Sequence, residues 1–193
     1  SFPDLESATE TVVAALQTGL ALNRIELADA LQMTAINRYS HAGLPETPTL
    51  WVELAGNEVS VPHDLSLFEQ LAQGAGAIRV QRAETAEAAN RLWRIRHDAL
   101  YAARALRPGI KGISTDVCVP VSRLPDCIGR IQREIAATGL KAPLIGHVGD
   151  GNFHLVLLFD PADAGETAAA RRINGVLVEL ALSKGGTATG EHG

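Results

Sequence analysis

Apolar and polar positions along the chain follow two different periods, which predict helices alternating with short strands. Apolar residues recur at helical spacing behind Asp4 or Ser7, either of which could cap a first helix that runs through Leu20. Further helices are expected over residues 30–39, 62–74, 84–104, 122–139 and 164–184. Strands are expected over residues 24–29, 48–54, 77–81, 113–121 and 154–159.

The strand over residues 48–54 shows the clearest alternation in the chain. Leu50, Val52 and Leu54 would point to one face of the sheet, and Trp51 and Glu53 to the other. Short strands and a hairpin favour antiparallel pairing, so we predict an α+β fold in which helices pack mainly on one face of an antiparallel sheet. The chain contains neither G-x-G-x-x-G nor G-x-x-x-x-G-K-[ST], so it offers no phosphate-binding loop of these two kinds.

The segment GHVGDGNFH, residues 146–154, carries the most informative local pattern. Asp150-Gly151 is a strong signal for a type I′ hairpin turn, which would place His147 directly opposite His154. Opposed residues on one sheet face have Cβ atoms roughly 4.5 to 5.5 Å apart. Two imidazoles at that separation can share one metal ion at about 2.0 to 2.1 Å. The alternative is that the two histidines only fill a sheet face.

A second polar segment, TATGEHG, lies at residues 187–193. It places Glu191 and His192 together among small residues that allow close approach to a metal. Two histidines and one glutamate form a familiar ligand set with a vacant coordination position. A substrate oxygen could bind at such a position and be polarised.

Arg96 interrupts an apolar stripe on the helix expected over residues 84–104. A guanidinium does not lose its charge, so its burial requires a carboxylate partner. One reading is an ion pair with an acidic residue of the core. The other is that Arg96 receives a substrate carboxylate in a bidentate manner.

Composition limits the function classes. The chain has 193 residues and a net charge of −5, which argues against nucleic acid as a partner. It has no long apolar run, and its two cysteines are too few for a disulfide framework and indicate a reducing compartment. Because the chain stops within its most polar loop, we expect it to be a piece of a longer protein, truncated at both ends.

The segments LWRIRHDALYAARALRPGIKGISTDVCVPVSRLP, GHVGDGNFH and TATGEHG together resemble the C-terminal substrate domain of FAD-linked oxidases, most closely the cytochrome-type D-lactate dehydrogenases. The similarity extends over residues 1–193. It implies a ferredoxin-like domain with a broad antiparallel sheet that caps a separate FAD-binding domain, which is absent from this chain.

The resemblance also assigns roles to individual residues. It implies that the ligands of a zinc or manganese ion are His147, His154 and Glu191. It implies that Arg96 grips the substrate carboxylate and that His192 contacts the substrate and removes its hydroxyl proton. We assign Asn152, beside the metal-binding histidines, to cofactor binding. The 2-hydrogen of the substrate would leave as hydride to FAD.

Two positions depart from relatives that act on D-2-hydroxyglutarate. Those relatives carry a lysine and an asparagine where this chain has Ser114 and Val156. We therefore expect a small 2-hydroxy acid with one carboxylate, D-lactate above all, while glycolate and D-2-hydroxyglutarate stay open. The expected electron acceptor is a cytochrome or a quinone. A homodimer also stays open.

The expected compartment is the cytoplasm, with peripheral attachment to the inner membrane open, and the mitochondrion if the source is eukaryotic. We expect this domain alone to be inactive without its flavin domain. Two readings of other classes remain: a metal-dependent hydrolase that uses the same two histidines and glutamate, and a binding module without catalysis.

Overall fold

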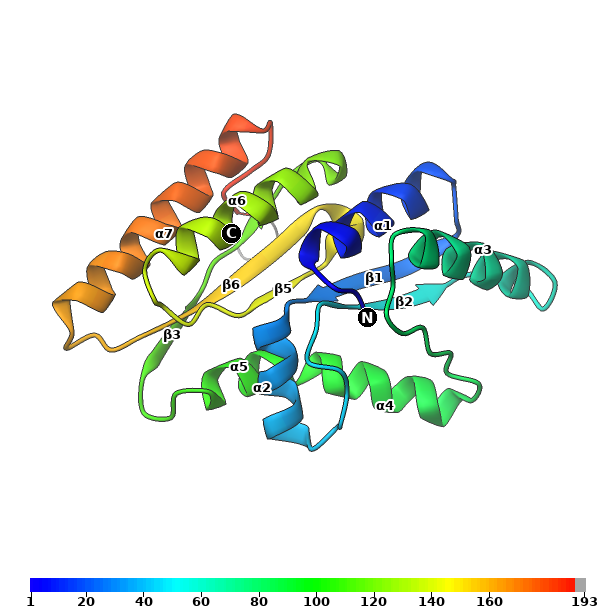
Figure 1. Ribbon diagram of the computed structural model, residues 1–193, viewed down its shortest axis with the longest axis horizontal. Coiled ribbons are helices and arrows are strands. Elements are labelled where there is room, and N and C mark those ends of the chain that lie inside the picture. Colours follow the sequence, from blue (N-terminus) through cyan, green and yellow to red (C-terminus); the bar gives the residue numbers. More distant parts are fainter. Residues whose placement is uncertain (190–193) are drawn as a thin grey trace.

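The strands of the computed structural model, which describes residues 1–189, form one antiparallel sheet (Figure 1). Its order is β2-β1-β5-β6-β3, and β4 also pairs with β6. The strands are β1 Leu22–Ala28, β2 Thr49–Leu54, β3 Lys111–Ser114, β4 Val117–Cys118, β5 Leu144–Gly146 and β6 Asn152–Phe159. The helices are α1 Leu5–Gln17, α2 Ala30–Ser40, α3 Ser60–Gly74, α4 Ala86–His97, α5 Ala99–Ala105, α6 Leu124–Ala136 and α7 Ala164–Ser183.

Two helix layers enclose the sheet (Figure 1). Helices α1, α3, α6 and α7 pack on one face around the larger apolar cluster, and α2, α4 and α5 cover the other face around smaller clusters. The central strand β6 is buried along its whole length because it serves both layers. Phe153 and Leu155 face the larger cluster, while Val156 and Leu158 face α5. The predicted α+β class with an antiparallel sheet is confirmed.

The local patterns located most elements correctly. Asp4, not Ser7, caps α1, since its Oδ1 accepts a hydrogen bond from the Ser7 amide at 2.8 Å, although the helix ends before Leu20. In β2, Leu50 packs on the larger cluster and Trp51 on the opposite one, as the alternation predicts. No helix within residues 1–189 is long and apolar enough to cross a membrane.

Two expected elements are wrong. Residues 77–81 form no strand: the Ile78 amide donates to the Ser1 carbonyl at 2.8 Å, and the Ile78 side chain is 60% exposed. The helix expected over residues 84–104 breaks at Asp98 into α4 and α5. The break lets α5 pack on α2, where Gln32 donates from Nε2 to the Ala99 carbonyl at 2.9 Å.

The strand expected over residues 113–121 is also interrupted. The regular strand stops at Thr115 and Asp116, between β3 and β4. Thr115 still binds β6, because its amide donates to the Leu155 carbonyl and its hydroxyl accepts from the Leu155 amide, both at 2.9 Å. The interruption places two polar residues beside the middle of β6.

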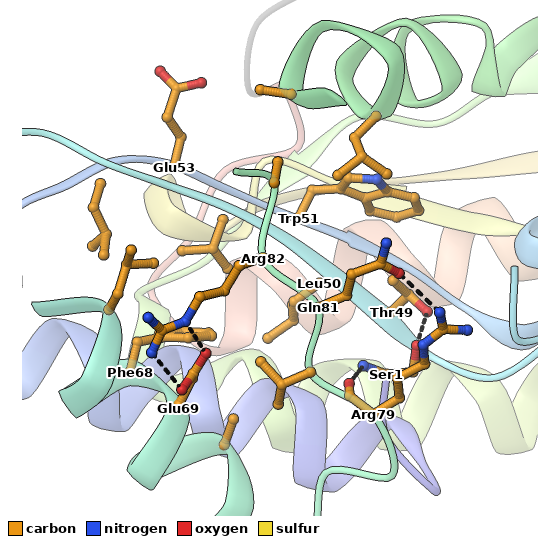
Figure 2. A pocket seen from close by; sticks show the side chains of 18 of the residues that line it. Ser1, Thr49, Leu50, Trp51, Glu53, Phe68, Glu69, Arg79, Gln81 and Arg82 are labelled. Atoms are coloured by element: carbon orange, nitrogen blue, oxygen red, sulfur yellow. Dashed lines mark hydrogen bonds and ion pairs between the residues drawn. The ribbon is translucent and has the colours of Figure 1, made fainter. Parts of the chain in front are cut away.

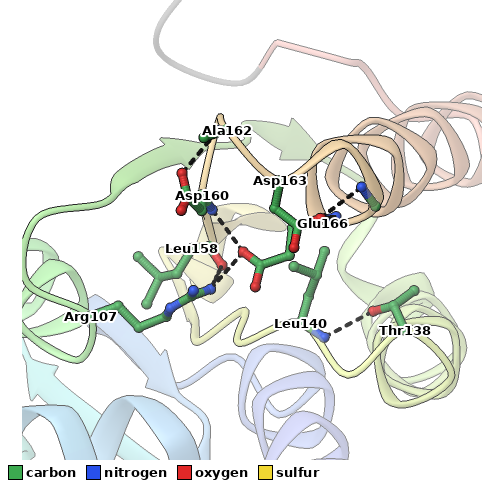
Figure 3. Close-up of polar contacts among 9 residues, drawn as sticks. Arg107, Thr138, Leu140, Leu158, Asp160, Ala162, Asp163 and Glu166 are labelled. Atoms are coloured by element: carbon green, nitrogen blue, oxygen red, sulfur yellow. Dashed lines mark hydrogen bonds and ion pairs between the residues drawn. The ribbon is translucent and has the colours of Figure 1, made fainter.

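An ion pair closes the far end of β6 (Figure 3). Arg107, after α5, donates to Glu166 of α7 at 2.8 Å and to the Leu158 carbonyl at 3.3 Å. Glu166 also accepts from the Asp160 amide at 2.7 Å. These contacts join the loop after α5, the end of β6 and the start of α7.

Asp29 caps α2 with a carboxyl that is buried against the sheet. Its Oδ1 accepts from the Gln32 amide at 2.7 Å, and Gln132 donates to Oδ2 at 3.4 Å. Burial raises the pKa of this carboxyl from 3.8 to about 6. Between about pH 4 and pH 6 the unfolded chain therefore releases a proton that the folded chain keeps, so this group lowers stability as the pH rises through that window.

The Asp29→Asn variant removes this destabilisation and keeps a good N-cap residue. At about pH 7.5 we expect it to be more stable than the wild type by about 2 to 3 kcal/mol, since one pKa unit corresponds to about 1.4 kcal/mol. The gain should shrink toward about pH 4. Urea unfolding of both proteins across this range measures the difference, and a variant that is less stable at every pH would contradict the assignment.

Candidate functional site

The connection between β5 and β6 differs from the predicted two-residue turn. Ile145, not His147, pairs with His154. The residues after His147 form a 3-10 turn, Val148–Asp150, which ends at Gly151 with a φ of 79°. The predicted type I′ turn at Asp150-Gly151, with His147 directly across from His154, is therefore wrong. The longer turn arises because the Asp150 and Asn152 amides both donate to the His147 carbonyl, at 3.1 and 3.2 Å.

The two imidazoles nevertheless lie close together. The ring centroids of His147 and His154 are 5.9 Å apart, and the ring planes meet at 84°. With metal–nitrogen distances of about 2.0 to 2.1 Å, two rings on one tetrahedral ion have centroids about 5 Å apart, and wider angles allow up to about 6.4 Å. The observed 5.9 Å lies within this limit, so both rings can reach a single ion at an angle wider than tetrahedral.

The hydrogen bonds of both rings define their tautomers. His154 is buried, and its Nδ1 lies 2.9 Å from the Thr115 carbonyl, which can only accept a hydrogen bond. His147 Nδ1 lies 2.7 Å from Glu26 Oε1. Each ring therefore carries its proton on Nδ1, which leaves Nε2 as the lone-pair atom of the neutral ring. Metal-binding histidines are commonly held in this way.

Glu26 is the site residue that the sequence interpretation missed. It lies on β1 between Ile25 and Leu27, which face the larger cluster, and its own side chain points to the opposite layer and is 9% exposed. Burial raises the pKa of Glu26, but the hydrogen bond from His147 and the charge of Arg96 outweigh this effect and hold the pKa below its usual range. The signal in the sequence was an acidic residue between two apolar residues of a strand, Ile25 and Leu27.

Two roles were predicted for Arg96, an ion pair within the core and a contact with a substrate carboxylate, and the structure shows the ion pair. Its Nη2 donates to Glu26 Oε2 at 2.7 Å, and its side chain is 12% exposed. Its Nε is buried and has no hydrogen-bond partner among the described residues. The contact with a substrate carboxylate stays a prediction.

Asn152 has a structural position within the site. Its Nδ2 donates to Asp116 Oδ1 at 2.8 Å and to the Val117 carbonyl at 3.1 Å, which holds β4 against β6. Asp116 Oδ1 also lies 3.6 Å from His154 Nδ1. The predicted contact of Asn152 with a cofactor stays a prediction.

Two predicted site residues, Glu191 and His192, lie outside the described residues. Within residues 1–189, no group of three histidine, cysteine or carboxylate side chains could hold a metal ion. The described part of the chain does bring residue 187 to the site, because Thr187 and Cys118 exchange backbone hydrogen bonds of 2.8 and 3.2 Å. Cys118 in turn contacts the Asp150 carbonyl through Sγ, at 3.2 Å.

A cavity of about 300 Å³ lies beside edge strand β2, between α3, α4 and residues 79–83 (Figure 2). Leu50, Trp51 and Phe68 form part of its apolar wall, and Arg82 donates to Glu69 at 2.6 Å at its rim. None of the described site residues His147, His154, Arg96 and Asn152 lines this cavity. The cavity and the histidine site are therefore separate features.

The family described as "FAD linked oxidases, C-terminal domain" matches residues 1–193. The chain belongs to this family. The resemblance inferred from the sequence motifs is thereby confirmed: the geometry described above is that of an FAD-linked oxidase C-terminal domain.

Curated relatives of this FAD-linked oxidase domain share its whole length. A "Probable D-lactate dehydrogenase, mitochondrial" of Danio rerio is 42% identical over 193 residues. A "D-lactate dehydrogenase [cytochrome], mitochondrial" of Arabidopsis thaliana is 39% identical, and "Glycolate oxidase subunit GlcD" of Escherichia coli strain K12 is 31% identical. The chain spans only 39%, 34% and 39% of these three proteins.

Solved structures share the fold of the FAD-linked oxidase domain at low sequence identity. A 4-ethylphenol oxidase from Gulosibacter chungangensis, in an isoeugenol complex, superposes with a TM-score of 0.67 at 10% identity and covers 96% of this chain and 43% of its own. An alkyldihydroxyacetonephosphate synthase superposes with a TM-score of 0.56 at 11% identity and covers 96% of this chain and 39% of its own. These similarities support the fold alone.

The turn between the histidines depends on Gly151, because a Cβ there would lie 1.9 Å from the Val119 carbonyl oxygen. We expect Gly151→Ala to lower the free energy of unfolding by about 4 kcal/mol or more, since backbone strain and overlap add. Gly185 is a matched control, with the same φ of 79° and no neighbouring atom within 4 Å of its Cβ position. Gly185→Ala should cost only about 1 to 2 kcal/mol. Chemical denaturation compares the two, and equal losses would contradict the close approach.

Proposed function

We propose that this domain forms the substrate- and metal-binding part of an FAD-dependent 2-hydroxy acid dehydrogenase that oxidises D-lactate to pyruvate. The observation that carries the proposal is the pair His147 and His154, both held through Nδ1, next to the half-buried guanidinium of Arg96. Relatives named D-lactate dehydrogenase at 42% and 39% identity support the substrate. Their names favour an oxidoreductase over the hydrolase and the binding module.

His147 and His154 would hold a divalent ion, zinc or manganese, through their Nε2 atoms. We assign Glu191 as the third ligand. It follows Thr187 by four positions, a reach of at most about 14 Å, and Thr187 pairs with Cys118 beside the turn. A bound ion of this type lowers the pKa of a coordinated oxygen, which would ease removal of the substrate hydroxyl proton.

Arg96 would bind the substrate carboxylate. Its guanidinium stays charged, and Glu26 occupies only one of its donor atoms among the described residues. Charge-assisted contacts made by a buried guanidinium are strong and fix the orientation of a planar carboxylate. His192 would accept the hydroxyl proton. FAD would accept the hydride that leaves C2 of the substrate. We assign Asn152 to contact with FAD.

The neighbourhood of Ser114 and Val156 supports a substrate with one carboxylate. These two positions pair directly across β3 and β6, and Val156 is buried against Ala103 of α5. Neither side chain carries a charge that could bind a second carboxylate. Glycolate is the alternative within this class, since one relative is a glycolate oxidase subunit at 31% identity.

The names of the relatives extend the proposal to partner and location. Of the three relatives described above, one is named for a cytochrome and two are named mitochondrial, so we propose a cytochrome as electron acceptor, a quinone as the alternative, and a mitochondrial location in a eukaryotic source. A homodimer stays a prediction.

Anaerobic flavin reduction by the full-length protein tests the proposed function. We expect D-lactate to bleach the flavin faster than L-lactate, glycolate or D-2-hydroxyglutarate. A chelator should slow bleaching about 100-fold or more, because a metal contributes several kcal/mol of charge stabilisation. Rapid reduction by D-lactate that survives complete removal of metal would contradict the metal site.

The Arg96→Lys variant tests carboxylate binding separately. Lysine keeps the charge beside Glu26 but loses the planar pair of donors, so kcat/KM for D-lactate should fall about 10- to 100-fold, mainly through KM. Arg94→Lys is the matched control, because Arg94 lies on the same helix and is exposed. Equal kinetics of the two variants would contradict the role of Arg96.

A further inference from the structure

One buried carboxylate joins the two halves of the proposed site. Glu26 Oε2 accepts from Arg96 Nη2 at 2.7 Å, and Glu26 Oε1 lies 2.7 Å from His147 Nδ1. Only 9% of the Glu26 side chain is exposed, so both contacts lie where water competes weakly. The three residues come from β1, α4 and the turn after β5, which are distant in sequence.

The charge of Arg96 determines what Glu26 can do. The guanidinium does not deprotonate, so the Glu26 carboxylate beside it stays ionised and can only accept hydrogen bonds. His147 must then donate from Nδ1, which keeps the lone pair on Nε2. The ion pair with Arg96 thus fixes the tautomer of His147, and the same carboxylate fixes the plane of the Arg96 guanidinium.

We propose that Glu26 is a positioning residue that couples the arginine for the substrate carboxylate to the histidine for the metal; this inference rests on the function proposed above. Glu26 contacts neither substrate nor metal in this scheme. It holds one ligand nitrogen in its binding tautomer and one guanidinium in its binding orientation. Its loss should therefore weaken metal binding and substrate binding together.

Two variants of the full-length protein separate this role from a purely structural one. Glu26→Gln removes the charge, so its amide can accept from only one of the two partners through its oxygen. Glu26→Asp keeps the charge, so Arg96 is not left buried without a counter-ion, but its shorter side chain cannot span both partners. If Glu26→Gln does not fold, Glu26→Asp still tests whether Glu26 positions His147 and Arg96.

Glu53→Gln is the matched control. Glu53 lies on neighbouring strand β2 and also pairs with an arginine, since Arg24 Nε donates to it at 3.0 Å. Its side-chain hydrogen bonds among the described residues go to Asn23 and Arg24, away from the proposed site. Circular dichroism and flavin content establish that each variant is folded.

The experiment measures the Kd for Mn²⁺, and in parallel for Zn²⁺, of each metal-stripped protein, and then kcat and KM for D-lactate at saturating metal. We expect both Glu26 variants to bind metal about 10- to 100-fold more weakly, as for other partners of ligating histidines. Glu53→Gln should match the wild type. Saturating metal should restore kcat of Glu26→Asp but leave its KM raised, because Arg96 remains displaced.

Different results overturn different claims. If the wild type binds metal and folded Glu26→Asp keeps both the wild-type Kd and KM, the positioning role is wrong and the proposed function stands. If both ions fail to bind to the wild type, the proposed metal site is wrong, and the coupling by Glu26 falls with it.

Discussion

A carboxylate in the buried half of a strand is costly unless charged and hydrogen-bonded partners surround it. Glu26 has both kinds of partner, Arg96 and His147, at 2.7 Å each. These contacts draw α4 and the turn after β5 toward one point on β1. The smaller helix layer covers the sheet and also places the guanidinium of Arg96 on the same face on which the two histidines lie close together.

Close backbone approaches shape the rest of the site. A Cβ at Gly151 would meet the Val119 carbonyl oxygen at 1.9 Å, and a Cβ at Gly149 would meet the Ile25 side chain at 2.8 Å. The turn is therefore packed between β1 and the residue that follows β4, where a standard two-residue hairpin turn would not supply the same contacts. This packing carries His147 past the end of β5 and leaves its ring 5.9 Å from that of His154.

Local patterns predicted the α+β class, a first helix capped by Asp4 or Ser7, and the two faces of β2, because these follow from neighbours in the sequence. They failed where a distant partner decides the structure. Residues 77–81 have strand-like composition but find no strand to pair with, and α4 ends at Asp98 so that α5 can reach α2. The histidine pair was predicted with the wrong register but the right proximity. Glu26 was missed because its role depends on its contact with Arg96, which lies 70 positions away in the sequence.

Family membership and site geometry both support the proposed function, in which this domain orients a 2-hydroxy acid for a flavin bound elsewhere in the full-length protein. The most direct test is a crystal structure of the full-length protein grown with Mn²⁺, with anomalous scattering to locate the ion. The account predicts an ion about 2.0 to 2.3 Å from Nε2 of both His147 and His154, with Glu26 still bound to Nδ1 of His147. An ion bound through Nδ1, or an ion elsewhere with both histidines unliganded, would contradict it.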